Sequence, residues 1–136
     1  MMNIEMHLRI AGLSMVMLSI SHVFIAKRLA WKRDVSQLTP INQQVFYVHA
    51  FFICLILMLM GILCMRFPQS LITPTPLARL ILSGLVIFWA TRLVFQWLVY
   101  DSSHWRGNRT NTIVHVMATV LWSYYTVVFA AVLRSQ

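Results

Sequence analysis

Residues 45–64 read VFYVHAFFICLILMLMGILC, and this stretch decides the fold. It contains no aspartate, glutamate, lysine or arginine, and it carries one histidine, His49. A helix needs about 20 predominantly apolar residues to cross the hydrocarbon core of a bilayer. Three further stretches are also long and apolar enough, namely residues 10–26, 80–100 and 112–133. The sequence therefore predicts four transmembrane helices.

The composition of the whole chain supports this interpretation. Hydrophobic residues make up 60% of the 136 residues, charged residues make up 10%, and the mean hydropathy is +0.74. In an ordinary soluble domain the charged residues alone approach about a quarter. Because the connections between the apolar stretches are short, neighbouring helices should run antiparallel. We predict one all-α domain over residues 1–136, an integral membrane four-helix bundle with up-down-up-down topology.

Local sequence signals mark helix starts. Thr39-Pro40 and Thr75-Pro76 each place a capping hydroxyl before a proline, whose missing N–H is not needed in the first helical turn. We therefore predict that helices begin at these two points. Near the N-terminus, Glu5, His7 and Arg9 are predicted to form a solvated, frayed helix start.

The formal net charge is +8, and the basic residues lie at the ends of the apolar stretches instead of along one solvated face. Basic residues gather in the loops after the first and third stretches, and fewer lie at the opposite ends. The positive-inside rule then predicts both of these loops in the cytoplasm and both termini outside a cytoplasmic membrane. Anionic lipid headgroups are the expected partner, and nucleic acid is not. The basic residues are Lys27, Arg28, Lys32, Arg33, Arg106 and Arg109 on the inner side, and Arg9, Arg66, Arg79 and Arg134 on the outer side.

Three histidines share one predicted depth. His22, His49 and His115 lie in three different apolar stretches, each near the end that the charge pattern assigns to the cytoplasm. Measured from their interfacial neighbours by helix rise, they lie ~6 to 8 Å inside the boundary. Polar residues at such positions are costly in lipid and tend to be functional. We therefore predict a histidine-lined site near the cytoplasmic face.

Polar residues on the third and fourth stretches recur every three or four positions and so share a helix face. On the third stretch these are Arg92, Gln96 and Tyr100, and on the fourth they are His115, Thr119, Trp122 and Thr126. We predict Arg92, Gln96 and Asp101 as the groups that contact a substrate or support the histidines. An ion pair between Arg92 and Asp101 with a purely structural role is the alternative.

This arrangement permits several kinds of chemistry. Imidazole is the commonest nitrogen ligand of transition metals, so His22, His49, His115 and His104 are predicted metal ligands. Alternatively, His49 and His115 would be the axial ligands of a b-type haem. A pocket without a cofactor would handle protons or bind a lipid or quinone headgroup. A further alternative is a small accessory subunit of a larger membrane complex, in which the histidines are structural.

Four segments carry a resemblance to other proteins: SHVFIAKRLAWKRD, INQQVFYVHAFFI, FWATRLVFQW and HWRGNRTNTIVH. They resemble a group of small bacterial membrane proteins with four transmembrane helices. The resemblance covers most of the chain and implies the four-helix fold and the bacterial inner membrane. It implies no activity.

Overall fold

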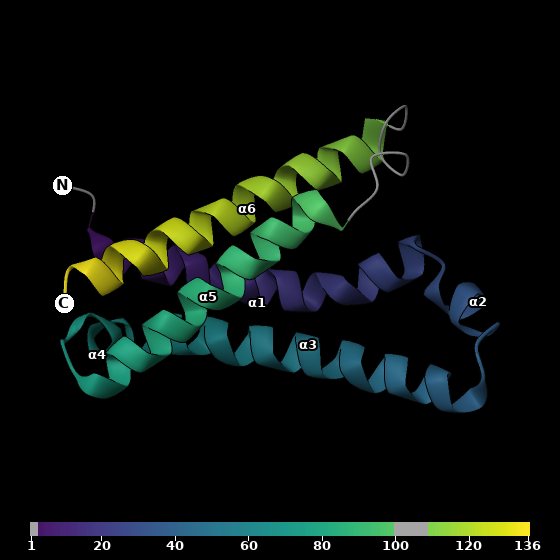
Figure 1. The fold of residues 1–136 in the computed structure, drawn as a ribbon, viewed down its shortest axis with the longest axis horizontal. Coiled ribbons are helices and arrows are strands. Elements are labelled where there is room, and N and C mark those ends of the chain that lie inside the picture. Colours follow the sequence, from purple (N-terminus) through teal and green to yellow (C-terminus); the bar gives the residue numbers. More distant parts are fainter. Residues whose placement is uncertain (1–2, 100–108) are drawn as a thin grey trace. The chain divides into compact units, whose positions relative to one another are not determined.

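The computed structural model describes residues 3–99 and 109–136, which form helices and no strands. The helices are α1 (Ile4–Arg28), α2 (Trp31–Val35), α3 (Pro40–Arg66), α4 (Pro68–Ile72), α5 (Pro76–Leu98) and α6 (Arg109–Arg134) (Figure 1). Four of them, α1, α3, α5 and α6, are long and apolar enough to cross a membrane. The predicted all-α class and the number of membrane-spanning candidates are confirmed.

The chain divides into two compact units, which we describe separately. The first comprises residues 9–67, with most of α1 and all of α2 and α3. The second comprises the chain up to Leu8 and the residues from Pro68 to Gln136, with the start of α1 and all of α4, α5 and α6. The single four-helix bundle with up-down topology remains a prediction.

Within the first unit, α1 and α3 run antiparallel and approach closely. Arg9 donates to the backbone oxygen of Met65 (2.8 Å), and Ser19 donates through Oγ to the backbone oxygen of Cys54 (2.7 Å). Between these two contacts the helices meet at Gly12 and Gly61. A Cβ atom added at Gly12 would lie 2.6 Å from the Gly61 oxygen, and one added at Gly61 would lie 2.7 Å from the Gly12 oxygen. Small residues of this kind allow membrane helices to pack backbone against backbone.

Within the second unit, α5 and α6 pack against each other along their lengths and α4 contacts both (Figure 1). The core of this pair is aromatic. Trp89 stacks on Trp122 with 5.1 Å between ring centroids, and Tyr125 lies 4.4 Å from Trp89 by the same measure. At one end of the pair, Arg79 donates to the backbone oxygen of Gln136 (2.7 Å), which ties the start of α5 to the end of the chain.

The helix starts agree with the sequence in position, with one difference in capping. Proline occupies the first turn of both α3 and α5, as the two Thr-Pro pairs predict. The hydroxyl of Thr75 accepts a hydrogen bond from the Ala78 N–H (3.0 Å). Thr39 has an extended backbone but makes no side-chain capping bond, so the hydroxyl prediction is wrong there. The neighbouring Pro40 supplies no N–H, which leaves a smaller set of first-turn donors to satisfy.

The N-terminal turn is more ordered than the sequence suggests. Nδ1 of His7 lies 3.0 Å from the hydroxyl oxygen of Tyr124. The side-chain carboxylate of Glu5 accepts a hydrogen bond from the side-chain amide of Gln69 (2.6 Å). The prediction of a frayed start is therefore wrong. The partners come from α6 and α4, more than sixty residues away in the chain, and sequence spacing does not reveal such contacts.

Candidate intramembrane polar site

A polar cluster joins α5 and α6 inside their apolar pair. Its members are Gln96, His115 and Trp122, whose side chains are 6%, 8% and 7% exposed. Gln96 Nε2 lies 2.8 Å from His115 Nδ1, and Trp122 Nε1 donates to Gln96 Oε1 across 3.3 Å. The amide thus connects two side chains of α6 that lie seven residues apart, or about two turns. The two stripes predicted from the sequence do face each other at these residues.

This network determines which nitrogen of His115 carries its proton. The indole N–H of Trp122 can only donate, so the atom of Gln96 that faces it must be the amide oxygen. The amide nitrogen of Gln96 then faces His115 and donates to Nδ1, which must accept. In the neutral imidazole the proton therefore lies on Nε2. His115 is held as a hydrogen-bond donor at Nε2.

Such a tautomer is better suited to hydrogen bonding than to metal ligation. A histidine that ligates a metal through Nε2 almost always donates Nδ1–H to an oxygen acceptor. Here Nδ1 faces an amide nitrogen, so ligation through Nε2 would require the Gln96 amide to turn over. The hydrogen bond from Trp122 would then be lost. The edge-to-face contact between Trp97 and His115, with centroids 5.8 Å apart, further restrains the ring.

Arg92 is held beside this cluster by an aromatic ring. Its guanidinium carbon lies 5.3 Å from the centroid of the Trp122 indole. A cation within about 6 Å of an aromatic ring face is attracted to it, more strongly where water is excluded. Arg92 lies one helical turn before Gln96 on α5, so the guanidinium and the amide occupy one face of the helix. The predicted ion pair between Arg92 and Asp101 involves a residue outside those that the structure describes.

A buried donor lies next to Trp122. Trp89 is 1% exposed, and among the described residues its indole N–H has no hydrogen-bond partner. A buried polar group without a partner costs about 1–3 kcal/mol, so such groups in native proteins require an explanation. Trp89 is not among the site residues predicted from the sequence. Its position seven residues before Gln96 on the same face of α5 was the available signal.

The threonines of the predicted stripe have a local role. Thr119 donates to the backbone oxygen of His115 (2.9 Å), and Thr126 donates to that of Trp122 (2.8 Å). Both bonds return to the preceding turn of α6, which is a common way for a hydroxyl to be satisfied within a helix. The hydrogen bonds of these two side chains therefore stay within α6.

His22 and His49 lie in the first unit and have the opposite arrangement to His115. Nδ1 of His22 lies 2.8 Å from the Leu18 oxygen, and Nδ1 of His49 lies 2.8 Å from the Val45 oxygen. A carbonyl oxygen only accepts, so Nδ1 carries the proton and Nε2 holds the lone pair in the neutral ring. The Ser19–Cys54 contact gives a common reference height for α1 and α3. Measured from it by helix rise, the heights of His22 and His49 along the helix axes differ by about 3 Å.

The predicted metal ligands are divided between the two units and the residues outside the described ranges. Residues 3–99 and 109–136 contain no set of three or more histidine, cysteine, aspartate or glutamate side chains placed to hold a metal ion. His22 and His49 belong to one unit and His115 to the other, so their common depth stays a prediction. His104 and Asp101 lie outside the described residues, as does Tyr100.

Comparisons with known proteins add no family or fold relative. No protein-family model, no curated protein and no solved structure matches the chain.

Proposed function

We propose that this chain is a multi-pass protein of the bacterial cytoplasmic membrane that binds the polar head of an amphipathic molecule on α5 and α6. The expected ligand has an apolar tail and a head with oxygen acceptors, as in a quinone or a phospholipid. The observation that carries the proposal is the Gln96 bridge between Trp122 and His115, which directs His115 to donate through Nε2. Oxygen acceptors are the partners that such a donor recognises.

Two neighbouring groups support the same ligand chemistry. Arg92 supplies a planar cation beside the cluster, and a guanidinium pairs well with phosphate or carboxylate oxygens. The buried Trp89 N–H is a second donor for which an acceptor is expected. Polar and charged side chains inside a membrane usually mark a ligand or transport path, because placing them there is costly. Asp101 keeps its predicted role as a third polar group of this site.

Binding to purified protein in detergent tests the proposal. The titrants are a short-tailed benzoquinone and phosphatidylglycerol, and the signal is quenching or shift of tryptophan fluorescence. We expect saturable binding of one titrant, and the titrant that binds identifies the source of the oxygen acceptor. Gln96→Leu should abolish this binding, whereas Thr119→Val should retain it because Thr119 bonds only within α6. A wild-type protein that binds neither contradicts the proposal and favours the accessory-subunit alternative.

A transition metal or b-type haem is the second candidate, and one observation favours it. His22 and His49 donate Nδ1–H to backbone oxygens, the orientation that metal-ligating histidines commonly have. Together with His115 and His104 they would form the predicted metal site, and His49 with His115 the predicted haem site. A Soret band, or stoichiometric zinc, iron or copper in the purified protein, would favour this candidate. Loss of this band or of the bound metal in His22→Ala or His49→Ala variants would identify these histidines as ligands.

The orientation is part of the proposal. The basic residues after α1 and before α6 are placed in the cytoplasm, with both termini outside. In a variant without native cysteines, a single cysteine at Lys32 should react with a membrane-impermeant maleimide only after the cells are opened. A cysteine at Gln136 should react in intact spheroplasts. Labelling of position 32 from the outside would contradict this orientation.

A further inference from the structure

The connection between α1 and α3, which we call the elbow (residues 27–38), carries a local excess of positive charge. Lys27, Arg28, Lys32 and Arg33 are all exposed, and Asp34 is the only acidic residue among them. These charges lie between the end of one membrane-spanning candidate at Arg28 and the start of the next at Pro40. Four basic residues and one acidic residue leave the elbow with a net charge of +3.

Contacts within the first unit hold the elbow against the beginning of α3. The backbone reverses at Ala30, which has the left-handed conformation (φ 52°), and α2 follows directly. Trp31 meets the ring of Phe46 edge to face with centroids 5.0 Å apart, and Gln43 donates to the Leu38 oxygen (2.9 Å). Val35 is buried. The basic side chains are thus carried by a folded segment that returns to α3.

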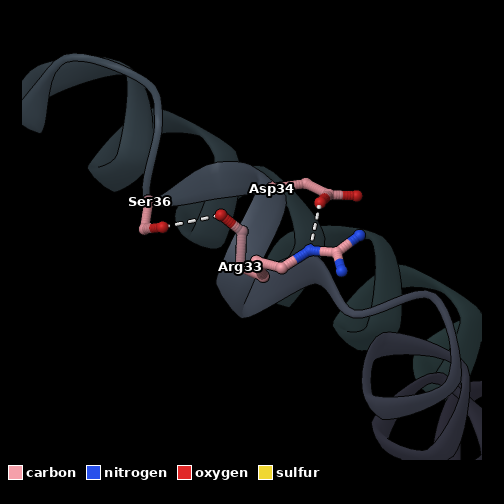
Figure 2. A network of polar contacts seen from close by, with 3 residues as sticks. All are labelled: Arg33, Asp34 and Ser36. Carbon is pink, nitrogen blue, oxygen red and sulfur yellow. Dashed lines mark hydrogen bonds and ion pairs between the residues drawn. The ribbon is translucent and has the colours of Figure 1, made fainter.

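The one acidic residue neutralises little of this charge. Arg33 Nε donates to Asp34 Oδ1 across 3.2 Å, while the Ser36 hydroxyl donates to the Arg33 backbone oxygen (Figure 2). The two charged side chains are 80% and 60% exposed, and ion pairs at such exposure are weak. Lys27, Arg28 and Lys32 have no carboxylate within ion-pair distance in residues 3–99 and 109–136.

Apolar side chains are exposed beside these charges. Leu29 and Leu38 are 52% and 44% exposed, and each lies within a few residues of the basic group. Trp31, which lies between these two leucines in the sequence, is half-buried. A soluble anion would match the charges but would leave the leucines in water. A phospholipid matches both, because its phosphate meets the cations and its acyl region covers the leucines.

We propose that the elbow is a binding site for anionic phospholipid headgroups in the membrane that α1 and α3 cross. This proposal rests on the proposed function only in that α1 and α3 cross a membrane, and it involves no residue of the α5–α6 site. The net charge supplies the attraction and the contacts of Trp31 and Gln43 supply a fixed platform. The elbow thereby selects negatively charged lipids over zwitterionic ones.

Lipid binding to the full chain in detergent tests the site. The probes are phosphatidylglycerol and phosphatidylcholine, and the readout is the number and affinity of lipids retained in native mass spectrometry. Each basic residue near an anionic surface contributes roughly fivefold to affinity, so Lys32→Gln/Arg33→Gln should weaken phosphatidylglycerol binding about 25-fold. The matched control, Arg66→Gln/Arg134→Gln, removes the same charge from exposed residues at helix ends outside the elbow. It should leave the affinity within about twofold.

A second variant separates binding from misfolding, because it should raise affinity. Asp34→Asn removes the acidic residue beside Arg33 and should strengthen phosphatidylglycerol binding several-fold while leaving phosphatidylcholine unchanged. The site is refuted if wild-type protein retains both lipids equally, or if the control pair weakens binding as much as the elbow pair. The comparison is repeated in a Gln96→Leu background, where a lipid at the α5–α6 site is lost and the elbow lipid stays bound, so failure of the α5–α6 proposal and failure of the elbow are distinguishable.

Discussion

The amide of Gln96 on α5 donates a hydrogen bond to Nδ1 of His115 on α6 across 2.8 Å. The same amide accepts the N–H of Trp122, so one side chain fixes the proton position of a buried histidine in a pair of membrane-spanning candidates. The consequence is chemical. His115 is prepared to donate through Nε2, which suits an oxygen acceptor better than a metal ion.

Removing the amide should destabilise the α5–α6 pair. Gln96→Leu leaves the Trp122 N–H and His115 Nδ1 buried without their partner. Buried unsatisfied groups cost about 1–3 kcal/mol, and single interhelical hydrogen bonds in membranes average ~0.6 kcal/mol, so we expect a loss of about 1–2 kcal/mol. Unfolding in mixed micelles measures it. Thr119→Val is the control with a smaller effect, and equal stability of Gln96→Leu and wild type would count against a bridging role.

The histidine tautomers should differ between the two units. Long-range ¹H–¹⁵N correlation spectra of labelled protein should show His115 protonated at Nε2, with His22 and His49 protonated at Nδ1. Gln96→Glu should move the His115 proton to Nδ1, because a carboxylate accepts where the amide donated. The spectra of His22 and His49 should not change in this variant. Nδ1 protonation of His115 in the wild type would refute the network.

The glycine contact between α1 and α3 should not tolerate a methyl group. A Cβ atom at Gly12 or Gly61 would lie under 3.0 Å from a backbone oxygen of the other helix, so the helices would have to separate. We expect Gly12→Ala and Gly61→Ala each to cost about 1–3 kcal/mol, as overpacking usually does. Gly84 has open space around an added Cβ, and Gly84→Ala should be neutral or slightly stabilising. Thermal unfolding in detergent compares the three, and a similar loss at Gly84 would show a general intolerance instead of this contact.

Arg92 distinguishes a ligand-binding role from a structural one. If it contacts the ligand, Arg92→Leu should retain folding and lose ligand binding. Arg92→Lys should then bind nearly as poorly, because lysine lacks the planar fork. If it forms a structural ion pair with Asp101, both variants should unfold at lower temperature. The double variant Arg92→Leu/Asp101→Asn should then recover much of the loss, and such rescue with binding intact would remove Arg92 from the site.

Much of the fold could be predicted from the sequence because a membrane imposes a length and a composition on its helices. The stretch around His49 and the prolines at 40 and 76 were sufficient to locate two helices, α3 and α5. α1, α3 and α6 extend beyond their predicted apolar spans at both ends, whereas α5 begins before its span and ends at Leu98. Polar and interfacial residues continue a helix at its ends, so hydropathy gives the span and not the full element.

The site was only partly predictable. Helical periodicity placed Gln96 and Arg92 on one face and His115 and Trp122 on another, and the structure brings these faces together. Periodicity does not give the direction of a hydrogen bond, and the tautomer of His115 follows only from two distances. The role of Trp89 was missed because a tryptophan in an apolar run resembles any core residue. The shared depth of the three histidines stays a prediction.

Native mass spectrometry of the protein as purified from bacterial membranes tests the central claim most directly, because it measures the mass of any molecule that stays bound to the chain. Apart from lipid held at the elbow, we predict one bound molecule per chain with the mass of a quinone or a phospholipid in the wild type and in Thr119→Val. Gln96→Leu should lose it. One haem b or one transition-metal ion per chain, retained equally by Gln96→Leu, would contradict the claim that the Gln96–His115 pair forms a headgroup site.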